Sequence, residues 1–404
     1  MRRLRIAILH RHYAPSGGGA ERYAAALAAQ LAQRHEVHVY AQHIAPDAGA
    51  PGVTVHPVSA PWARPRWLNQ LWYATATWWA TRRGFDIVHA HENTWHGNVQ
   101  TVHVLPVWHN HWAGRSGWKR WSRSVSACFS PRLWTYLGLE ALRFRVPDVQ
   151  RPVAGAEVAQ PGALARCVIA TSEPVRAILA QTFPACVPAL RVLTPGIEAV
   201  HEPSPAERRE ARAQLQLAAD AQWLVFVGND FAKKGLDTLL QAMALLPPQA
   251  CLLVVGNGGG RRGHDAAAGF QARARALGLT QRVVFAGALA DVSVAYRAAD
   301  LLVHPTREDT FAMVVLEAMA AGRPVVVSAA PWCGMAAMLR AGEDASLLSD
   351  PFDAAGLAAA VQPLLNDAPL RARRRERGLA FAAAHTWEAK AREQEALYAC
   401  CVRP

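Results

Sequence analysis

Long apolar runs are absent from this sequence of 404 residues. No segment approaches the roughly 18 consecutive apolar residues that cross a bilayer as a helix. The basic start, MRRLRIAIL, has an apolar stretch far too short for a secretory signal peptide. We therefore expect neither a transmembrane segment nor a leader, and we expect a cytoplasmic protein.

Cysteine is scarce, with seven residues that show no metal-site spacing. An odd number without a regular framework argues against a disulfide scaffold and predicts reduced thiols. Hydrophobic residues make up 51% of the chain and glycine and proline are ordinary, so disorder is not expected. The length predicts two domains, or at most three.

Acidic residues are few in the first half of the chain. Residues 1–200 carry 21 Arg and Lys against 10 Asp and Glu, whereas residues 201–404 carry 22 against 21. The same half holds 11 of the 14 tryptophans, all between Trp62 and Trp134. A basic, Trp-rich half beside a neutral half indicates two domains with different partners, and an anionic membrane surface or acceptor suits the first.

Apolar runs alternate with helical patterns along most of the chain. This rhythm predicts an α/β protein with two doubly wound, Rossmann-like domains that face each other across a cleft. We place the first domain at residues 1–200, with an insertion at about 105–150, and the second at 201–380. A last helix at 381–404 is expected to return to the first domain. No internal repeat is visible.

Two acids, Asp309 and Glu317, bracket an almost wholly apolar segment, REDTFAMVVLEAMAAG. If the helix starts near Thr310 or Phe311, eight helical residues separate the acids by about 12 Å, the scale of a nucleotide sugar. Asp309 would then face sugar hydroxyls and Glu317 the ribose. The alternative is a helix cap at Asp309 and an exposed Glu317, although the apolar neighbours of Glu317 favour partial burial.

This segment resembles the acid-x7-acid signature of the family-4 retaining glycosyltransferases, which have the GT-B fold. The family pattern has Glu first and Gly three residues later, where this chain has Asp309 and Ala312. Glu308 is an alternative first acid. The stretch VGNDFAKKG resembles the family's phosphate loop, with Lys234 at its lysine and Asn229 at its usual arginine, and Lys233 could compensate. The second half is closest to bacterial lipopolysaccharide-core glucosyltransferases.

Other stretches resemble the same family. The loop HYAPSGGGAERYA places Gly18 and Gly19 where backbone can approach phosphate, and it lacks the G-x-G-x-x-G and Walker patterns of NAD and ATP sites. His103 matches a histidine that contacts the sugar or orients the acceptor. The resemblance implies catalytic roles for Asp309, Glu317, Lys234 and His103. It implies donor binding by Gly18, Gly19, Asn229, Lys233, Lys234, Asn257, Ala288, Leu289, Glu308, Asp309, Thr310, Phe311, Ala312 and Glu317.

The segment 107–124 interleaves four tryptophans with four basic residues. This pattern suits a lipid headgroup interface, while a packed core or single-stranded nucleic acid binding are the alternatives. Two H-x-H pairs, His89 with His91 and His109 with His111, could hold a metal with Glu92, but we expect none. We expect no cofactor and no nucleic acid partner.

These features together predict a retaining, metal-independent hexosyltransferase at the inner face of the cytoplasmic membrane. It would move a hexose, with glucose as the favoured sugar, from a UDP-sugar to a glycolipid acceptor such as the lipopolysaccharide core. The alternatives are a non-catalytic binder of membrane or nucleic acid through the basic half, and a metal hydrolase built on the histidines.

Overall fold

The computed structural model describes residues 2–62, 64–113, 116–128, 130–145, 166–258 and 263–402. The chain forms two compact units. Unit 1 comprises Met1–Gly196 and Trp387–Pro404, and unit 2 comprises Ile197–Thr386. The change of unit after Gly196 lies close to the expected position, and the last helix starts at Trp387 rather than at residue 381.

Unit 1 is built on a seven-stranded parallel sheet with the order β5-β3-β1-β6-β7-β8-β9. Its strands are β1 (Arg5–Leu9), β3 (Glu36–Ala41), β5 (Val53–Pro57), β6 (Ile87–Ala90), β7 (Val99–Val102), β8 (Cys167–Ala170) and β9 (Leu190–Val192), with a small pair β2 (His12–Tyr13) and β4 (His43–Ile44). Alternate residues of β1 face opposite sides: Ile6 and Ile8 pack in one apolar cluster, and Ala7 and Leu9 in another. Both faces are therefore buried, as in doubly wound sheets.

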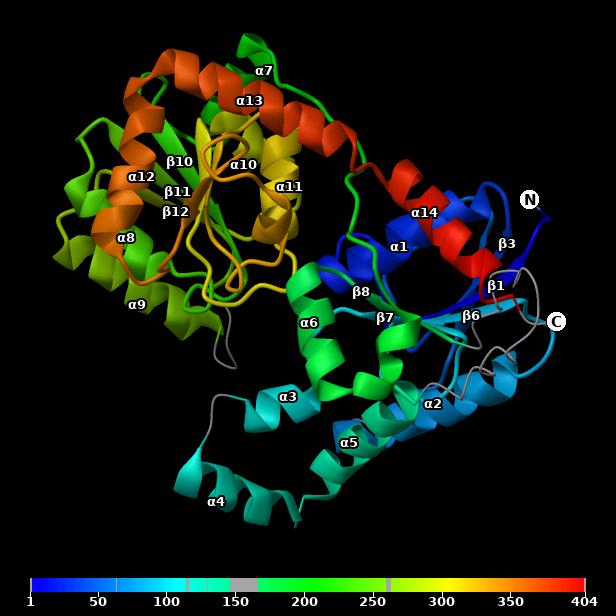
Figure 1. Ribbon diagram of the computed structural model, residues 1–404. Helices are drawn as coiled ribbons and strands as arrows, with labels where there is room; N and C mark the ends of the chain where they lie inside the picture. Colours follow the sequence, from blue (N-terminus) through cyan, green and yellow to red (C-terminus); the bar gives the residue numbers. More distant parts are fainter. Residues whose placement is uncertain are drawn as a thin grey trace, which may run out of the picture. The chain divides into compact units, whose positions relative to one another are not determined.

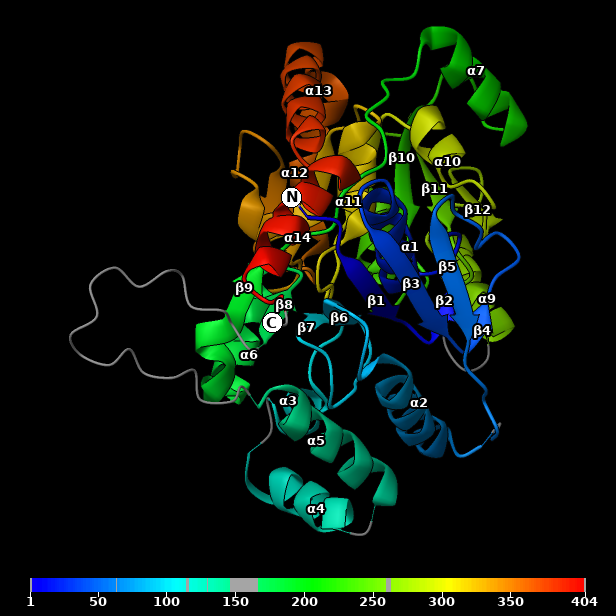
Figure 2. The ribbon, with the colours of Figure 1, turned by 90° about the vertical axis from the view of Figure 1, so that its right-hand side faces the viewer.

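Helices cover both faces of this sheet (Figure 1, Figure 2). The helical elements of unit 1 are α1 (Gly19–Ala32), α2 (Arg66–Thr81), α3 (Val107–Trp112), α4 (Gly117–Cys128), α5 (Pro131–Arg143), α6 (Glu173–Thr182), the 3-10 turn η1 (Pro184–Ala189) and α14 (Trp387–Ala399). Trp387 and Tyr398 of α14 enter the same core as α1, and the Tyr398 hydroxyl is 2.7 Å from His89 Nδ1. The last helix is thus part of unit 1.

Unit 2 has a six-stranded parallel sheet with the order β12-β11-β10-β13-β14-β15. Its elements are α7 (Pro205–Gln214), β10 (Gln222–Val227), α8 (Leu236–Leu245), β11 (Ala250–Val255), α9 (Gly263–Ala276), β12 (Val283–Gly287), α10 (Ser293–Ala298), β13 (Leu301–His304), α11 (Met313–Ala320), β14 (Val325–Ser328), η2 (Met335–Met338), β15 (Ser346–Leu348), α12 (Ala354–Asn366) and α13 (Ala368–Ala383). One apolar cluster joins the sheet to α8 and α12, and another joins it to α10 and α11. The predicted doubly wound α/β architecture is confirmed.

The predicted insertion corresponds to α3, α4 and α5, as far as residue 145. The one acid of residues 105–145 is Glu140, which is buried. Its carboxylate accepts hydrogen bonds from the backbone N–H groups of Val107 (2.6 Å) and Trp108 (3.1 Å) and so caps α3. Among the described helices of the chain, none is long and apolar enough to cross a membrane.

Candidate functional site

A glycine lets two loops of unit 2 approach each other closely. They are the lysine loop after β10, which carries Lys233 and Lys234, and the acid loop after β13, which carries Glu308 and Asp309. Gly235 starts α8 with φ +77°, and a Cβ there would lie 2.0 Å from the Pro305 carbonyl oxygen. No other residue fits such a close approach at positive φ. The Arg307 backbone N–H also donates to the Lys233 carbonyl at 2.8 Å. These contacts place Lys234 beside Asp309 at the carboxyl end of the sheet, where ligands of such folds bind.

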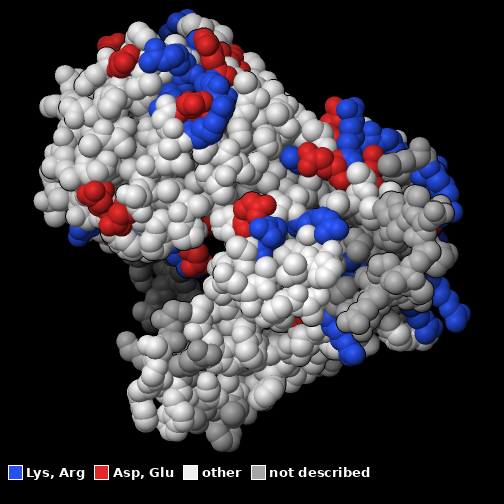
Figure 3. Space-filling model, viewed as in Figure 1, with Lys and Arg blue, Asp and Glu red and all other residues white. Residues whose placement is uncertain are grey.

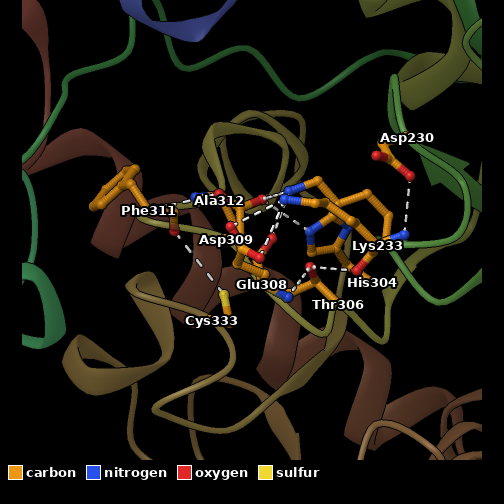
Figure 4. A network of polar contacts seen from close by, with 10 residues as sticks. Asp230, Lys233, His304, Thr306, Glu308, Asp309, Phe311, Ala312 and Cys333 are labelled. Carbon is orange, nitrogen blue, oxygen red and sulfur yellow. Dashed lines mark hydrogen bonds and ion pairs between the residues drawn. The ribbon is translucent and has the colours of Figure 1, made fainter. Parts of the chain in front are cut away.

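Asp309 is the centre of a polar network in unit 2 (Figure 4). Its Oδ2 accepts from Lys234 Nζ at 2.5 Å and is 3.3 Å from His304 Nε2. Its Oδ1 accepts from the backbone N–H groups of Phe311 at 3.3 Å and Ala312 at 2.8 Å. Asp309 therefore links the lysine loop to the segment just before α11. It is not the helix cap that the sequence left as an alternative, because the N-cap of α11 is Ala312.

The environment keeps Asp309 ionised. Burial by itself favours the neutral acid, but the hydrogen bond from His304 and the charge of Lys234 outweigh it and lower the pKa of Asp309. Burial also lowers the pKa of His304. A neutral His304 that donates from Nε2 fits this geometry, because its buried Nδ1 has no hydrogen-bond partner among the described residues and a proton there would be unpaired.

Glu308, the alternative first acid, lies in a different environment. Its side chain is 52% exposed and forms an ion pair with Lys233 at 3.1 Å. An exposed pair of this kind adds little stability, so both side chains can rearrange around a ligand. Asp309 and Lys234 are by contrast only 16% and 20% exposed.

Glu317 lies within α11, and its neighbours Leu316 and Ala318 are buried. The Tyr296 hydroxyl of α10 donates to Glu317 Oε2 at 2.8 Å. The partial burial expected from the apolar neighbours is observed, and the contact with Tyr296 orients the carboxylate. We had no expectation for Tyr296.

The predicted start of the helix at Thr310 or Phe311 is wrong, because α11 starts at Met313. Asp309 bridges Cys333 in a parallel arrangement, with its N–H donating to Trp332 and its carbonyl accepting from Gly334. These contacts keep the chain before the helix non-helical. The 12 Å estimate, which assumed continuous helix, therefore does not apply, and the N–H groups of Phe311 and Ala312 bind Asp309.

Ala312 adopts an uncommon backbone conformation, with φ +74° and ψ +68°. This left-handed region is unfavourable for residues with a Cβ. We expect Ala312→Gly to raise the free energy of unfolding by about 1 kcal/mol, since relief of strain exceeds the added flexibility of the unfolded chain.

Urea unfolding can test this effect with Ala321→Gly as the matched control. Ala321 lies at the other end of α11 with φ −87° and packs partly buried against the same core. Glycine there relieves no strain, so it should lower stability. Equal effects of the two substitutions would rule out backbone strain at Ala312.

The remaining expected donor residues of unit 2 lie at nearby loops. Asn229 is exposed after β10. Asn257 Oδ1 accepts from the Ala288 N–H at 3.1 Å and joins the loops after β11 and β12. Leu289 is partly buried against the core. The positions and contacts of these residues come from the structure, and their role toward a donor remains a proposal.

Gly18 and Gly19 start α1 in unit 1. A Cβ on Gly19 would meet nothing within 4 Å, and one on Gly18 would meet the flexible end of Glu21. Neither glycine has the positive φ that only glycine tolerates well. The geometry leaves open space beside this helix start, without requiring glycine there.

His103 directly follows β7 and belongs to a histidine cluster in unit 1. Its Nε2 is 2.8 Å from His91 Nδ1, and the two rings stack at 5.1 Å. His89 Nε2 is 2.7 Å from Thr101 Oγ1. Burial lowers the pKa of His89 to about 3 and places the pKa values of His91 and His103 well below the usual value. Among the described residues, no His, Cys, Asp or Glu side chains form a group suited to a metal ion.

These buried histidines make stability depend on pH. Their folded pKa values lie below the unfolded value near 6.5, so the unfolded chain binds more protons at acidic pH. The stability they contribute is complete above about pH 6.5 and is lost as pH falls below it. Below that pH, each of the three histidines should lower the free energy of unfolding of unit 1 by about 1.4 kcal/mol per pH unit.

Tryptophan fluorescence during urea unfolding at pH 7 and pH 5.5 measures this loss, because most tryptophans lie in unit 1. The pKa values of His12, His35 and His56 are also lowered by burial and act in the same direction. Unit 1 stability that is unchanged over this interval would contradict the expectation.

Two residues of the site were missed from sequence, His304 and Tyr296. His304 is the last residue of the apolar strand β13, and a polar residue at the carboxyl end of a buried strand was the available signal. Tyr296 carried no such signal, because its contact with Glu317 depends on the packing of α10 against α11.

Known protein families match both units. A model described as Glycosyltransferase Family 4 matches residues 17–200, and one described as Glycosyl transferases group 1 matches residues 221–367. Both units of the chain thus match glycosyltransferase family models, with family 4 matching over residues 17–200. The Escherichia coli K12 lipopolysaccharide glucosyltransferase WaaG is 32% identical over 188 residues, which are 45% of this chain and 48% of WaaG.

Other family relatives have a different acceptor in their name. The D-inositol 3-phosphate glycosyltransferase of Thermomonospora curvata is 35% identical over 262 residues, 60% of this chain and 58% of the relative. The chain thus spans about half the length of the curated relatives it matches.

Solved structures of similar fold cover almost the whole chain. The crystal structure of WaaG gives a TM-score of 0.75 at 22% identity, covering 96% of this chain and 98% of WaaG. The crystal structure of Anabaena Alr3699/HepE in complex with UDP and glucose gives a TM-score of 0.73 at 19% identity, covering 97% of this chain and 98% of HepE. The two Rossmann-like units of this chain therefore have the GT-B fold.

Proposed function

We propose that this protein is a retaining glycosyltransferase that transfers a hexose from a UDP-sugar to a glycolipid acceptor such as the lipopolysaccharide core. Glucose is the favoured hexose. The observation that carries the proposal is the contact between Lys234 and Asp309 at the carboxyl end of the unit 2 sheet. Glu317, oriented by Tyr296, lies in the helix that follows Asp309. The names of WaaG and of the HepE complex support glucose and UDP. The inositol phosphate relatives identify the main competing acceptor.

In the proposed reaction, Lys234 stabilises the diphosphate as negative charge develops on the leaving group. The acceptor hydroxyl attacks the anomeric carbon on the face from which UDP departs, and the leaving phosphate takes its proton. Glu317 accepts hydrogen bonds from the ribose hydroxyls. Asp309 holds Lys234 in place before the donor binds, and Glu308 with Lys233 can rearrange toward the sugar. No metal is part of this scheme.

Thermal unfolding with a panel of nucleotide sugars tests the donor assignment. A ligand that binds the folded state raises the apparent stability by mass action. We expect UDP-glucose and UDP to raise the melting temperature, and GDP- and ADP-sugars to raise it less. If no nucleotide sugar raises it, the proposed function is wrong.

Exposed tryptophans of unit 1 support an anionic membrane surface as a partner. Trp72, Trp78, Trp79, Trp108, Trp118, Trp121 and Trp134, on helices α2 to α5, are each at least 39% exposed. The Arg82 guanidinium lies 3.9 Å from the centroid of the Trp79 ring. The described residues of α3 and α5 form a largely uncharged surface on the face shown in Figure 3. Exposed amphipathic rings beside cations are typical of a bilayer interface.

Cosedimentation with phosphatidylglycerol vesicles is expected to show this partner. Trp79→Ala and Trp118→Ala should each weaken binding by about tenfold, because each removes a large apolar ring from the interface. Leu245→Ala is the control, since Leu245 is 62% exposed but lies on α8 of unit 2. Equal binding by all three variants would exclude these tryptophans from the contact.

A further inference from the structure

Three histidines of unit 1 follow the ends of adjacent strands. His10, His91 and His103 come directly after β1, β6 and β7, which are neighbours in the sheet. In the sheet, β3 lies on one side of β1 and β7 lies on the other side of β6. The strand order therefore reverses between β1 and β6, which makes this edge a topological switch point. Ligands of doubly wound folds bind at such an edge. A role was expected for His103 alone.

The hydrogen bond between His91 and His103 has two possible directions. Either His91 Nδ1–H donates to His103 Nε2, or His103 Nε2–H donates to His91 Nδ1, at the same 2.8 Å. Burial lowers the pKa of both rings, so near neutral pH each carries a single proton. His10, His89 and Arg143 also face the pair and oppose additional positive charge. The direction therefore decides which nitrogen of each ring is protonated.

The second nitrogen of His91 distinguishes these directions. His91 Nε2 is buried and has no hydrogen-bond partner among the described residues. If His103 were the donor, His91 would carry its proton on Nε2, and a buried N–H would remain unpaired. Unpaired buried N–H groups are rarer than unpaired acceptors. The geometry thus favours His91 Nδ1–H as the donor.

We propose that His91 is a positioning residue that donates to His103 Nε2, so that His103 carries its proton on Nδ1 and acts as a hydrogen-bond donor rather than as a general base. Tyr23 packs edge-on against the His103 ring at 4.9 Å and restricts its rotation. The inference rests on the proposed function, together with the expectation that His103 contacts the sugar or orients the acceptor. It agrees with the assignment of the acceptor proton to the leaving phosphate.

Nitrogen-15 NMR of protein labelled in its histidines tests the tautomer, with His103 identified from the spectrum of His103→Gln. We expect a protonated Nδ1 and an unprotonated, hydrogen-bonded Nε2 in His103 at pH 7.5. A protonated Nε2 would overturn the proposal. This measurement needs no substrate, and UDP-glucose thermal stabilisation tests the proposed function separately.

Kinetics of three variants test the positioning role. His91→Asn keeps an N–H close to the Nδ1 position and should retain transfer within about threefold, whereas His91→Leu should lower kcat by about tenfold with the donor KM unchanged. Thr101→Val is the matched control, because it removes the hydroxyl beside His89 Nε2 but not the His91–His103 contact. It should leave both kcat and the His103 spectrum as in the wild type. If the folded His91→Asn protein has a kcat no higher than that of His91→Leu, the proposal is overturned.

Discussion

Replacing Lys234 with alanine is expected to lower the rate of sugar transfer by about 10²–10³-fold. The ammonium group is fixed by Asp309 at 2.5 Å and by the Glu308 carbonyl at 3.1 Å. A fixed charge that meets a developing diphosphate requires little reorganisation during the reaction. Initial rates of UDP release measure the effect. Lys234→Arg should recover only part of the rate, because guanidinium has a different shape and reach.

Lys233→Ala is the control for this prediction. Lys233 is the adjacent residue, but its side chain is 54% exposed and pairs with Glu308, so we expect a loss of less than about fivefold. Thermal unfolding of Lys234→Ala shows whether the protein still folds when Asp309 has lost this partner. Transfer at the wild-type rate in a folded Lys234→Ala protein would remove Lys234 from the leaving-group role.

Replacing Glu317 with alanine is expected to abolish the thermal stabilisation by UDP-glucose. Hydrogen bonds to a charged group contribute about 1.5–3 kcal/mol each, so their loss weakens donor binding by roughly 10–100-fold or more. Tyr296→Phe removes only the hydroxyl that orients the carboxylate at 2.8 Å. We expect this variant to retain a reduced shift.

The comparison between these variants separates ribose binding from simple packing. Tyr296 packs in the same core cluster as Leu316 and Ala318, the neighbours of Glu317, so both variants can lose intrinsic stability. The decisive quantity is the shift caused by UDP-glucose relative to each variant without ligand. A wild-type shift in Glu317→Ala would contradict the ribose assignment.

The site was predictable in part, and the acid loop shows where prediction ended. Spacing and resemblance predicted roles for Asp309, Glu317 and Lys234, and the structure places these residues in loops and a helix around two neighbouring strands of unit 2. They did not indicate that Asp309 would have both oxygens bound by Lys234, His304 and two backbone N–H groups. Hydrogen-bond partners from distant segments have no local pattern in a sequence.

The start of α11 is a second example. Periodicity predicted helix from Thr310 onward because the residues are apolar and suit a helix. The bridge between Asp309 and Cys333 instead holds the chain extended, and Ala312 turns it at positive φ. A contact between residues 24 positions apart in sequence, from 309 to 333, overrode the local preference.

The sequence by itself determined the parallel sheets, since buried strands read as continuous apolar runs separated by amphipathic helices. It also indicated a glycosyltransferase family, through the resemblance of the lysine loop and the paired acids. Tertiary structure decided the tautomers and charges of the histidines, the partner of Glu317, and the backbone strain at Ala312. These properties depend on burial and on atoms brought together from separate segments, and neither is encoded in the order of neighbouring residues.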